Sequence, residues 1–480
     1  MRLHTRFRAH CHRQKLPTYR ILRLVEGKRL IRSAFWVLLG RGGATILTFL
    51  STVLVARMLT VQEVGWFFLF QTAAVLIAVP ARLGLDMAIV RFVTAARAQG
   101  SETAASQLAY GAALAVLVTA VAASLLGLAL FGLLGPTFGL RNEPLFIATV
   151  CGTWAGAIAL QQVLASIHWA HNDIVRYSLY RIFLGVLLFF GFLLFAWTTN
   201  LNPTLTLVVV ASILSGLASA AFALRDIHRA FAWPTAEGFL RRLREMLLFS
   251  SPLILSGLAV NLTYRADLWV VGAVVGVDDA AVYAVASRLV IALSLLTEVL
   301  NGVILPQAGK LLAEHNLAKL ETLVQRTSTA ATVIAVLILA FFALFGEQLV
   351  TALFGADYGD GIYVMMILLG AQFAVIFSGT PEHILVLAGK RGPAVKATVA
   401  TAFASIALAI PMGLVMGSVG VAAAVALCVT AQQLILRTLV YRLVGIRIGA
   451  SFGQLKTMAR GTHRHFRSLR SHRRSRNSPK

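Results

Sequence analysis

Four ionisable side chains lie inside two long apolar runs in the middle of the sequence, within the stretch 251–310. Arg265 and Asp267 lie in the first run, and Arg288 and Glu298 lie in the second. A charged side chain is costly in hydrocarbon, so within a membrane span it usually faces the interior of a helix bundle or a water-filled cavity. These residues therefore indicate a pathway through a membrane and not the core of a soluble domain.

The arginines predict an anionic ligand. Arg41 lies inside the first apolar run of the chain, and Arg41, Arg265 and Arg288 together outnumber the two carboxylates. Arginine keeps its charge when buried and binds phosphate oxygens through two parallel hydrogen bonds. We expect these arginines to bind the substrate together with Asn261, which is four residues from Arg265 and shares its helical face. The alternative is that they lock helices together as buried pairs or extend to the membrane interface.

The two carboxylates predict an ion-coupling site. Asp267 lies two positions from Arg265, and because a helix turns by about 100° per residue, these two side chains point to different sides. In the second run, Ser287, Ser294 and Glu298 return to nearly the same face, which gives a polar stripe through an apolar helix. We therefore expect Asp267 and Glu298 to contact a coupling ion, and a purely structural buried pair is again the alternative.

Two further arginines follow the second apolar run. Arg82 and Arg91 lie in the segment 81–93, which we place at the inner membrane interface. We expect them to lie at the mouth of the cavity, where they would meet the head group of an anionic ligand. Plain anchoring at the interface is the alternative. Arg57, at the far end of the first run, is expected to anchor the end of a helix.

The elements that position these residues are predicted to be membrane-spanning helices. The chain is 58% hydrophobic and only 13% charged, whereas a soluble domain carries roughly 25% charged residues. Twelve continuously apolar runs are each long enough to cross a hydrocarbon core of ~30 Å as a helix, and they do not alternate as the strands of a barrel would. Their limits are 33–57, 64–81, 107–134, 145–167, 177–197, 204–224, 248–275, 280–305, 328–350, 362–388, 394–415 and 419–440.

The net charge of +24 is concentrated in the tails and in alternate loops. Most of the 43 lysines and arginines lie there, whereas the intervening loops hold acidic residues such as Asp278 and Glu347. Basic loops favour the cytoplasmic side, so we expect both termini in the cytoplasm, as an even number of spans requires. The basic tails are expected to bind anionic lipids of the inner leaflet, and we do not expect nucleic acid as a partner.

A composition shift after the sixth run divides the chain into two halves. Val55–Phe67 is matched by Val271–Tyr283, since both pass from an apolar helix through a short acidic turn to an aromatic residue. An offset of six spans predicts two lobes of the same membrane orientation. The predicted units are a basic N-tail with an amphipathic helix (1–32), an N-terminal lobe (33–224), a cytoplasmic linker (225–246), a C-terminal lobe (247–445) and a basic C-tail (446–480).

No motif for an enzyme is present. The sequence has no Walker loop, no dinucleotide-binding glycine motif and no HExxH, and its predicted external loops are too short for a catalytic domain. The three cysteines, Cys11, Cys151 and Cys428, are scattered without the spacing of metal ligands. We therefore expect neither enzymatic activity nor a metal or cofactor. Any energy for transport would come from an ion gradient, the membrane potential or the gradient of the substrate.

Several segments, in order along the chain, resemble the oligosaccharide flippases of the Wzx type. Such flippases belong to the polysaccharide biosynthesis branch of the multidrug/oligosaccharidyl-lipid/polysaccharide (MOP) exporter superfamily, which also holds the multidrug and toxin extruders and the lipid II flippases. The resemblance covers Ala56 to Leu427. It is carried by ARMLTVQEVGWF, LGLDMAIVRF, the D-x-x-x-x-G of Asp267–Gly272, VYAVASRL, LFGADYGDG, LVLAGKRG and MGSVGVAAAVAL.

The resemblance implies an all-α integral membrane protein of MATE-like fold, in which two pseudo-symmetric six-helix bundles form a V around a cavity that opens alternately inward and outward. It also implies a cargo of oligosaccharide on polyprenyl pyrophosphate, moved across the bacterial inner membrane for the assembly of O-antigen, capsule or exopolysaccharide. Related flippases use cavity arginines for the pyrophosphate, and Arg41 and Arg265 are similar in placement. A polysaccharide polymerase and glycosyltransferases would then be partners.

Two features depart from the relatives and leave two other functions open. Twelve spans instead of fourteen argue against the lipid II flippase subgroup, and the first six spans hold few acidic residues. A cation-coupled multidrug exporter of the same fold would need carboxylates along the N-terminal cavity, where Asp86 is the only candidate. A membrane scaffold that does not transport, and that recruits glycosyltransferases through the basic tails, is the other alternative.

Overall fold

The computed structural model describes residues 40, 42–134, 144–171, 173–230, 239–451 and 453–454, and within them it contains helices and turns but no strand. The predicted N-tail, most of the predicted C-tail, the middle of the predicted linker and Arg41 lie outside these residues. The principal helices are a first helix (Gly42–Met58), α2 (Val61–Ala81), α3 (Leu85–Ala98), α4 (Glu102–Leu134), α5 (Pro144–Ala170), α6 (Ile174–Ser178), α7 (Leu184–Thr198), α8 (Leu205–Ala230), α9 (Phe239–Val274), α10 (Val277–Ala313), α11 (Leu317–Phe354), α12 (Gly361–Ser378), α13 (Pro381–Leu387) and α14 (Arg391–Val444).

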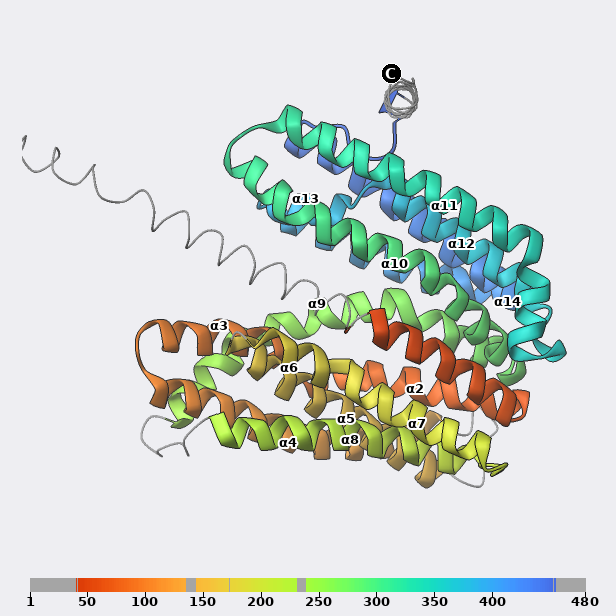
Figure 1. Cartoon of the computed structure of the whole chain (residues 1–480), viewed down its shortest axis with the longest axis horizontal. Helices are drawn as coiled ribbons and strands as arrows, with labels where there is room; N and C mark the ends of the chain where they lie inside the picture. Colours follow the sequence, from red (N-terminus) through yellow and green to blue (C-terminus); the bar gives the residue numbers. More distant parts are fainter. Residues whose placement is uncertain are drawn as a thin grey trace, which may run out of the picture.

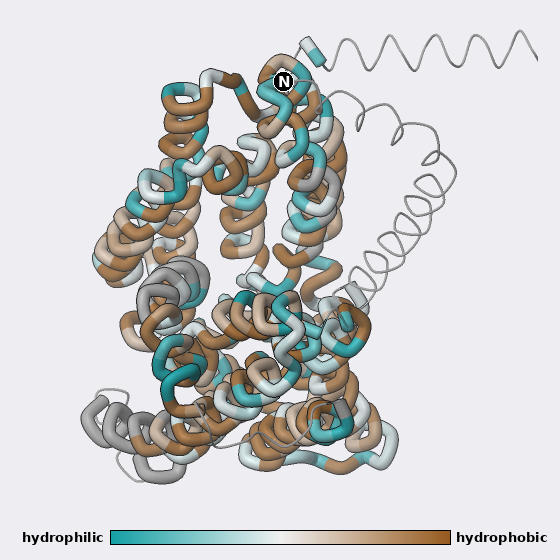
Figure 2. Tube along the Cα trace, turned by 90° about the vertical axis from the view of Figure 1, so that its left-hand side faces the viewer, coloured by the Kyte–Doolittle hydropathy of each residue, from teal (hydrophilic) through white to brown (hydrophobic). Residues whose placement is uncertain are grey.

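The described helices account for all twelve predicted spans. Nine helical segments of the described chain are long and apolar enough to cross a membrane. The first helix and α9 occupy two more of the predicted spans, and α14 contains two. Hydrophobic residues dominate the helices of both halves (Figure 2). Large apolar side chains such as Leu344 and Val415 are 70% and 83% exposed, as expected of surfaces that contact lipid.

Short polar turns begin the helices at the positions that the internal repeat predicts. Before α2, Thr60 and Glu63 form a reciprocal capping box, in which each side chain accepts the backbone N–H of the other residue. Before α10, the chain turns at Gly276, and Asp278 and Asp279 lie in the first turn, where negative charge stabilises the helix N-terminus. The two halves of the chain thus start corresponding helices with an acidic first turn, although only α2 has a side-chain cap.

The predicted spans 394–415 and 419–440 form a hairpin that reverses at Gly417. Gly417 has φ 63° and ψ −148° inside α14, a conformation that a side chain would strain. Beyond it the chain doubles back, because Gln432 Nε2 donates to Thr398 Oγ1 at 3.1 Å and Gly420 lies against the backbone of Met412. The prediction of two separate spans here is confirmed.

The predicted span 362–388 is broken in the structure, which corrects its continuous assignment. Gly379 and Thr380 both have left-handed backbone angles between α12 and α13. Pro381 begins α13, and a residue before proline disfavours the helical conformation. The break places the hydroxyl and backbone groups of Thr380 inside the bundle, which matters for the second cavity described below.

The helices gather in two lobes that meet at one end and diverge at the other (Figure 1). We call the first helix to α8 the N-lobe and α10 to α14 the C-lobe. At the end where they meet, α2 touches α10 so closely that a Cβ on Gly65 would lie 2.2 Å from the carbonyl oxygen of Val277. Phe49 of the first helix contacts Phe354 at the end of α11, with ring centroids 6.1 Å apart. We call this end the closed end.

Arg57 fastens the closed end, in agreement with its expected role as a helix-end anchor. Its Nε donates to the carbonyl oxygen of Leu353 at 2.9 Å, and Nη2 donates to that of Ala352. These carbonyls belong to the last turn of α11, which carries a partial negative charge and lacks helical partners. A guanidinium from the N-lobe therefore caps a helix of the C-lobe.

α9 lies between the lobes and contacts both (Figure 1). Near its start, the ring of Phe249 packs against Phe92, and the guanidinium of Arg91 lies over it at 4.3 Å. Arg242 donates to Gln107 Oε1 at 2.7 Å. At its other end, Val274 meets the Gly413 region of α14. One helix is therefore tied to the N-lobe at the diverging end and to the C-lobe at the closed end.

Candidate functional site

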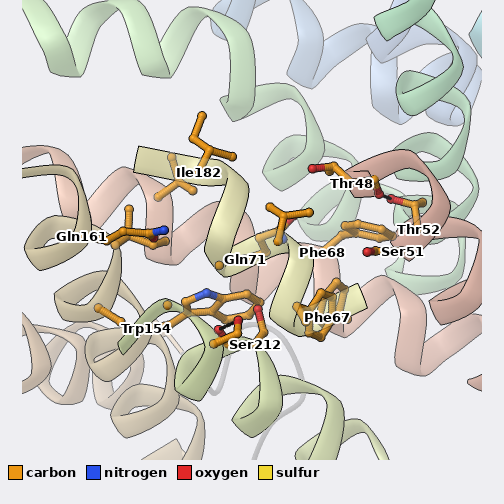
Figure 3. A pocket seen from close by; sticks show the side chains of 18 of the residues that line it. Thr48, Ser51, Thr52, Phe67, Phe68, Gln71, Trp154, Gln161, Ile182 and Ser212 are labelled. Atoms are coloured by element: carbon orange, nitrogen blue, oxygen red, sulfur yellow. Dashed lines mark hydrogen bonds between the residues drawn. The ribbon is translucent and has the colours of Figure 1, made fainter. Parts of the chain in front are cut away.

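A cavity of about 240 Å³ lies inside the N-lobe, where the first helix, α2, α5, α7 and α8 converge. In Figure 3, Gln161 lies on one side of this pocket, Thr48, Ser51 and Thr52 lie on the other, and Trp154 and Ser212 lie below. We call it the N-lobe cavity. Its wall is completed by two arginines from outside the N-lobe, Arg265 of α9 and Arg288 of α10.

Three arginines line the N-lobe cavity. They are Arg181, Arg265 and Arg288, and of the described residues that line this cavity none is acidic. Among the ion pairs found within the described chain, none involves these three side chains. Cations this close together repel one another in a partly dehydrated site. The cavity is therefore suited to an anion that several guanidinium groups can share.

Arg288 is held in position by contacts across the two lobes. Its Nη2 donates to Gln71 Oε1 of α2 at 2.7 Å, and its guanidinium carbon lies 5.2 Å from the ring centroid of Phe68. The neutral amide and the aromatic face orient the guanidinium without neutralising its charge. Arg288 thus remains available to an anion in the cavity.

Arg181 enters the cavity from a π-helical turn, Leu179–Phe183, that joins α6 to α7. This turn is fixed by α8, because Ser219 Oγ donates to the carbonyl oxygen of Tyr180 at 3.0 Å and Tyr180 Oη donates to Asp226 Oδ2 at 2.7 Å. The guanidinium of Arg181 also lies 5.4 Å from the ring centroid of Tyr177. Turns of this kind are frequent at functional sites because they re-aim side chains within a helix.

A second cavity, of about 760 Å³, lies in the C-lobe, and its charge is opposite. Asp267, Glu298 and Glu382 line this C-lobe cavity, whereas no lysine or arginine is among its described lining residues. Ser287, Ser294 and Glu298 all face it, so the polar stripe predicted along α10 is confirmed. Asp267 accepts hydrogen bonds from Tyr283 Oη at 2.8 Å and from the backbone N–H of Leu268 at 2.9 Å.

The two cavities are separated by α9 and α10. Arg265 lines the N-lobe cavity and Asp267 lines the C-lobe cavity, because two residues on a helix are separated by about 200°. The prediction that these two residues do not form one ion pair on one face is confirmed. Along α10, Arg288 faces one cavity while its neighbour Ser287 faces the other. The same two helices therefore present cations to one side and carboxylates to the other.

Two buried oxygen atoms of the C-lobe cavity lack hydrogen-bond partners within the described chain. They are Asn301 Oδ1, on α10, and Thr380 Oγ1, at the break between α12 and α13. In transporters, monovalent cations bind beside discontinuous helices, where oxygen atoms are left without helical partners, so a cavity with a helix break and two unpartnered oxygens is suited to such a cation. Among the described residues, no three His, Cys, Asp or Glu side chains gather closely enough to hold a metal ion.

The other residues predicted from the sequence lie outside these linings. Asn261 Nδ2 donates to the carbonyl oxygen of Gly257 in its own helix at 2.9 Å, and Asn261 lines neither cavity. Arg82 pairs with Asp86 at 3.4 Å and donates to Gln162 Oε1. Arg91 is exposed and packs on Phe249. Arg41 lies outside the described residues.

Sequence reasoning missed Arg181 and Glu382. In the sequence, Arg181 directly follows a polar turn, so its position is that of an ordinary residue at the membrane interface. Only the π-helical turn directs it into the cavity, and the apolar periodicity does not reveal that turn. Glu382 lies in a run that was predicted as one continuous span. The Gly-Thr-Pro sequence at 379–381 was the available signal, since it disfavours a continuous helix at that point.

The number of apolar helices and the two lobes define a multi-pass membrane protein. A multidrug resistance MATE family transporter of the MOP superfamily in an inward-facing conformation has the same fold, with a TM-score of 0.65 and 19% identity over 82% of this chain and 92% of that one. The lipid II flippase MurJ in an inward closed conformation superposes with a TM-score of 0.67 and 13% identity, over 84% and 87% of the two chains.

A third solved structure of this fold is a MOP superfamily transporter from Pyrococcus furiosus, described by the reverse polarity of its binding pocket. It has a TM-score of 0.58 and 17% identity, over 85% of this chain and 93% of that one. No curated protein matches the chain in sequence at a significant level. The family model for polysaccharide biosynthesis proteins matches residues 30–312, more than half of the chain. The chain belongs to the polysaccharide biosynthesis protein family.

Proposed function

We propose that this protein flips a polyprenyl-pyrophosphate-linked oligosaccharide across the bacterial inner membrane, for the assembly of a surface polysaccharide. The observation that carries the proposal is the cluster of Arg181, Arg265 and Arg288 around the N-lobe cavity, with no acidic residue in the described lining. A pyrophosphate carries several negative charges and presents oxygen atoms that arginine binds in a bidentate way. The family, which is one of polysaccharide biosynthesis, agrees with this cargo.

The division of the arginines between the lobes suggests how binding is linked to movement. Arg181 belongs to the N-lobe, Arg288 comes from the C-lobe, and Arg265 comes from the helix between them. Without an anion these charges oppose close approach of their helices. A bound pyrophosphate offsets the repulsion and allows the lobes to close around it. The lobes then separate at the closed end, and this outward-open state exposes the head group to the other side of the membrane.

The positive-inside pattern gives this motion a direction. It places the termini and the diverging end in the cytoplasm, and the closed end with Arg57 outside. In this orientation the structure is an inward-facing state, ready to receive a lipid-linked sugar made in the cytoplasm. Transport moves the substrate without covalent change, so we expect no enzymatic activity and no cofactor.

The C-lobe cavity is the proposed site of the coupling ion. Asp267 and Glu298 line it, and Asn301 Oδ1 and Thr380 Oγ1 would add uncharged oxygen ligands. A proton or a monovalent cation bound there would change the charge behind Arg265, because Asp267 is on the opposite face of the same helix. An ion gradient across the membrane would in this way shift the equilibrium between the inward-facing and outward-facing arrangements of the two lobes.

The multidrug exporter alternative finds no support in the described part of the N-lobe. Its requirement was carboxylates along the N-terminal cavity, and Asp86, the candidate, pairs with Arg82 and does not line that cavity. The basic tails lie largely outside the described residues. Their binding to anionic inner-leaflet lipids, and contacts with a polymerase and glycosyltransferases, remain part of the proposal.

The proposed function is tested by reconstituting the purified protein in liposomes that contain a fluorescent polyprenyl-pyrophosphate oligosaccharide. A membrane-impermeant quencher reports the fraction of head groups on the outer surface, and wild type is compared with Arg265→Ala and Arg181→Ala. Each hydrogen bond to a charged group contributes about 1.5–3 kcal/mol, and about 1.4 kcal/mol corresponds to a tenfold change. We therefore expect the initial rate to fall at least tenfold in each variant.

Arg326→Ala is the matched control, because Arg326 is exposed on α11 and lines neither cavity. It should flip at the wild-type rate. Retention of full activity by both cavity variants would move the pyrophosphate site elsewhere. If the wild type does not flip the lipid, with or without an ion gradient, the proposed cargo is wrong, and export of cationic dyes becomes the next assay.

A further inference from the structure

The N-lobe cavity has an uncharged part for which the arginines and the pyrophosphate do not account. Three aromatic side chains pack together along it. Phe67 lies 5.6 Å from Trp154 and 6.1 Å from Phe189, measured between ring centroids, and all three line the cavity. The faces of aromatic rings carry partial negative charge and attract the polarised C–H groups of a ligand.

Neutral hydrogen-bonding groups lie among these rings. Gln161 is 9% exposed and lines the cavity, and Gly185 leaves room for it, since a Cβ there would lie 2.9 Å from Gln161 Nε2. Ser51 is 4% exposed, and its Oγ has no hydrogen-bond partner within the described chain. A buried hydroxyl without a partner is unfavourable, so this part of the cavity is suited to a ligand that supplies hydroxyl groups of its own.

We infer that this part of the N-lobe cavity binds a pyranose ring, the sugar that is attached directly to the pyrophosphate. The inference rests on the proposed function, because the pyrophosphate at Arg181, Arg265 and Arg288 is what brings the sugar to this place. Trp154 provides the aromatic surface for the C–H face of the ring. Gln161 and Ser51 provide the donor and acceptor groups for its hydroxyls.

Size and polarity exclude the other parts of the cargo. The whole cavity, with its arginine side included, measures about 240 Å³, which is below the roughly 300 Å³ at which pockets for drug-sized ligands begin. It therefore has no room for several sugar rings beside the pyrophosphate. The polyprenyl chain is excluded because it would leave Gln161 and Ser51 without partners. The remaining sugars would then lie between the lobes, and the protein would select its cargo by the first sugar.

The inference is tested by equilibrium binding of radiolabelled lipids to the purified protein in lipid nanodiscs. Three probes share one polyprenyl chain: the bare pyrophosphate, the pyrophosphate with one hexose, and the pyrophosphate with one N-acetylhexosamine. We expect at least one sugar-bearing probe to bind wild type about tenfold more tightly than the bare lipid. Gln161→Leu removes the amide, and Gly185→Ala removes no lining group but displaces Gln161, because its Cβ would lie 2.9 Å from Gln161 Nε2. Both should abolish this difference and leave binding of the bare lipid within about twofold of wild type.

Gln348→Leu, on the exposed end of α11, is the matched control and should bind all three probes as wild type does. The inference is overturned if neither sugar tightens binding to wild type, or if Gln161→Leu weakens all three probes equally, and the proposed function survives both results. Wild type that binds none of the probes would overturn the proposed function and the inference with it. Arg265→Ala separates the two sites, since it should weaken all three probes together.

Discussion

At the scale of single residues, the protein uses neighbouring positions on one helix for opposite charges. Arg265 faces the N-lobe cavity and Asp267 faces the C-lobe cavity, because residues two positions apart in a helix are separated by about 200° around its axis. Asp267 is held by Tyr283, which is 1% exposed. A carboxylate fixed in this way stays on the side of the C-lobe cavity, so the two charges line separate cavities.

Asp267→Asn should uncouple transport from the ion gradient. The asparagine keeps the size of the side chain but can neither take up a proton nor contribute a charge to a cation site. We expect flipping without a gradient to continue at a rate within about threefold of wild type, whereas the acceleration by an imposed gradient is lost. The liposome assay, run with and without proton and sodium gradients, measures both rates.

Asp278→Asn is the matched control, since Asp278 is exposed in the first turn of α10 and lines neither cavity. It should keep the response to the gradient. A full response in Asp267→Asn would show that Asp267 has a structural role, and Glu298 would then be the next candidate for the coupling ion.

At the scale of elements, the closed end depends on close approach of α2 and α10 at a glycine. A methyl group on Gly65 would lie 2.2 Å from the carbonyl oxygen of Val277, a backbone atom that cannot move aside alone. Gly65→Ala should therefore force the helices apart. Overpacking of this kind costs typically 1–3 kcal/mol, and we expect a lower melting temperature in detergent together with a lower flipping rate.

Gly191→Ala is the control for this prediction, because the added methyl group on α7 meets no atom within 4 Å. It should melt at the wild-type temperature or slightly above, since alanine favours a helix over glycine. Equal melting temperatures for the two variants would mean that α2 and α10 do not touch in the folded protein as this structure has them.

The sequence predicted the helices well and their interruptions poorly. Apolar length alone located the twelve spans, and the acidic turn near Asp278 marked the start of α10. The π-helical turn Leu179–Phe183 and the break at Thr380 were not predicted. The π-helical turn depends on a partner elsewhere in the fold, Ser219, which donates to the carbonyl oxygen of Tyr180, and the local sequence carries no trace of that partner. The break at Thr380 had a local signal in Gly-Thr-Pro at 379–381, which apolar length alone does not register.

At the scale of the whole molecule, the proposed transport requires the two lobes to separate at the closed end and to approach at the other. α9 is attached to both lobes, through Phe249 at one end and Val274 at the other. Any motion of one lobe against the other therefore passes through α9, which also carries Arg265 and Asp267. Binding in either cavity acts on the helix that must move.

A disulfide across the closed end should arrest transport. A Cβ on Gly272 of α9 would lie 3.5 Å from Leu69 Cγ of α2, which is the position that the sulfur of a cysteine at residue 69 would take. A disulfide needs such close approach of the two side chains. In a background with the three native cysteines replaced by alanine, Leu69→Cys with Gly272→Cys should cross-link on oxidation. We expect oxidation to reduce flipping at least tenfold and a reductant to restore it. Flipping at the full rate by the cross-linked protein would contradict alternating access between these lobes.

Each single cysteine variant, treated with the same oxidant, is the control for chemical damage and should keep its own rate. The added disulfide holds the state that the structure shows, so binding of the lipid substrate should persist while its movement stops. This separates a block of the conformational change from loss of the site.

The sequence by itself determined what the chain is built from and what kind of ligand it favours. Apolar runs of span length require membrane helices, and the excess of arginine over carboxylate inside them favours an anion; both follow from the cost of charge in hydrocarbon. Only the tertiary structure decided where those charges go. It brought Arg181 to Arg265 and Arg288 from three different helices, and it separated Asp267 into a cavity of its own. The position of these charges depends on packing across the lobes. Residues meet at a cavity because distant helices cross there, and the order of residues along one helix does not determine where helices cross.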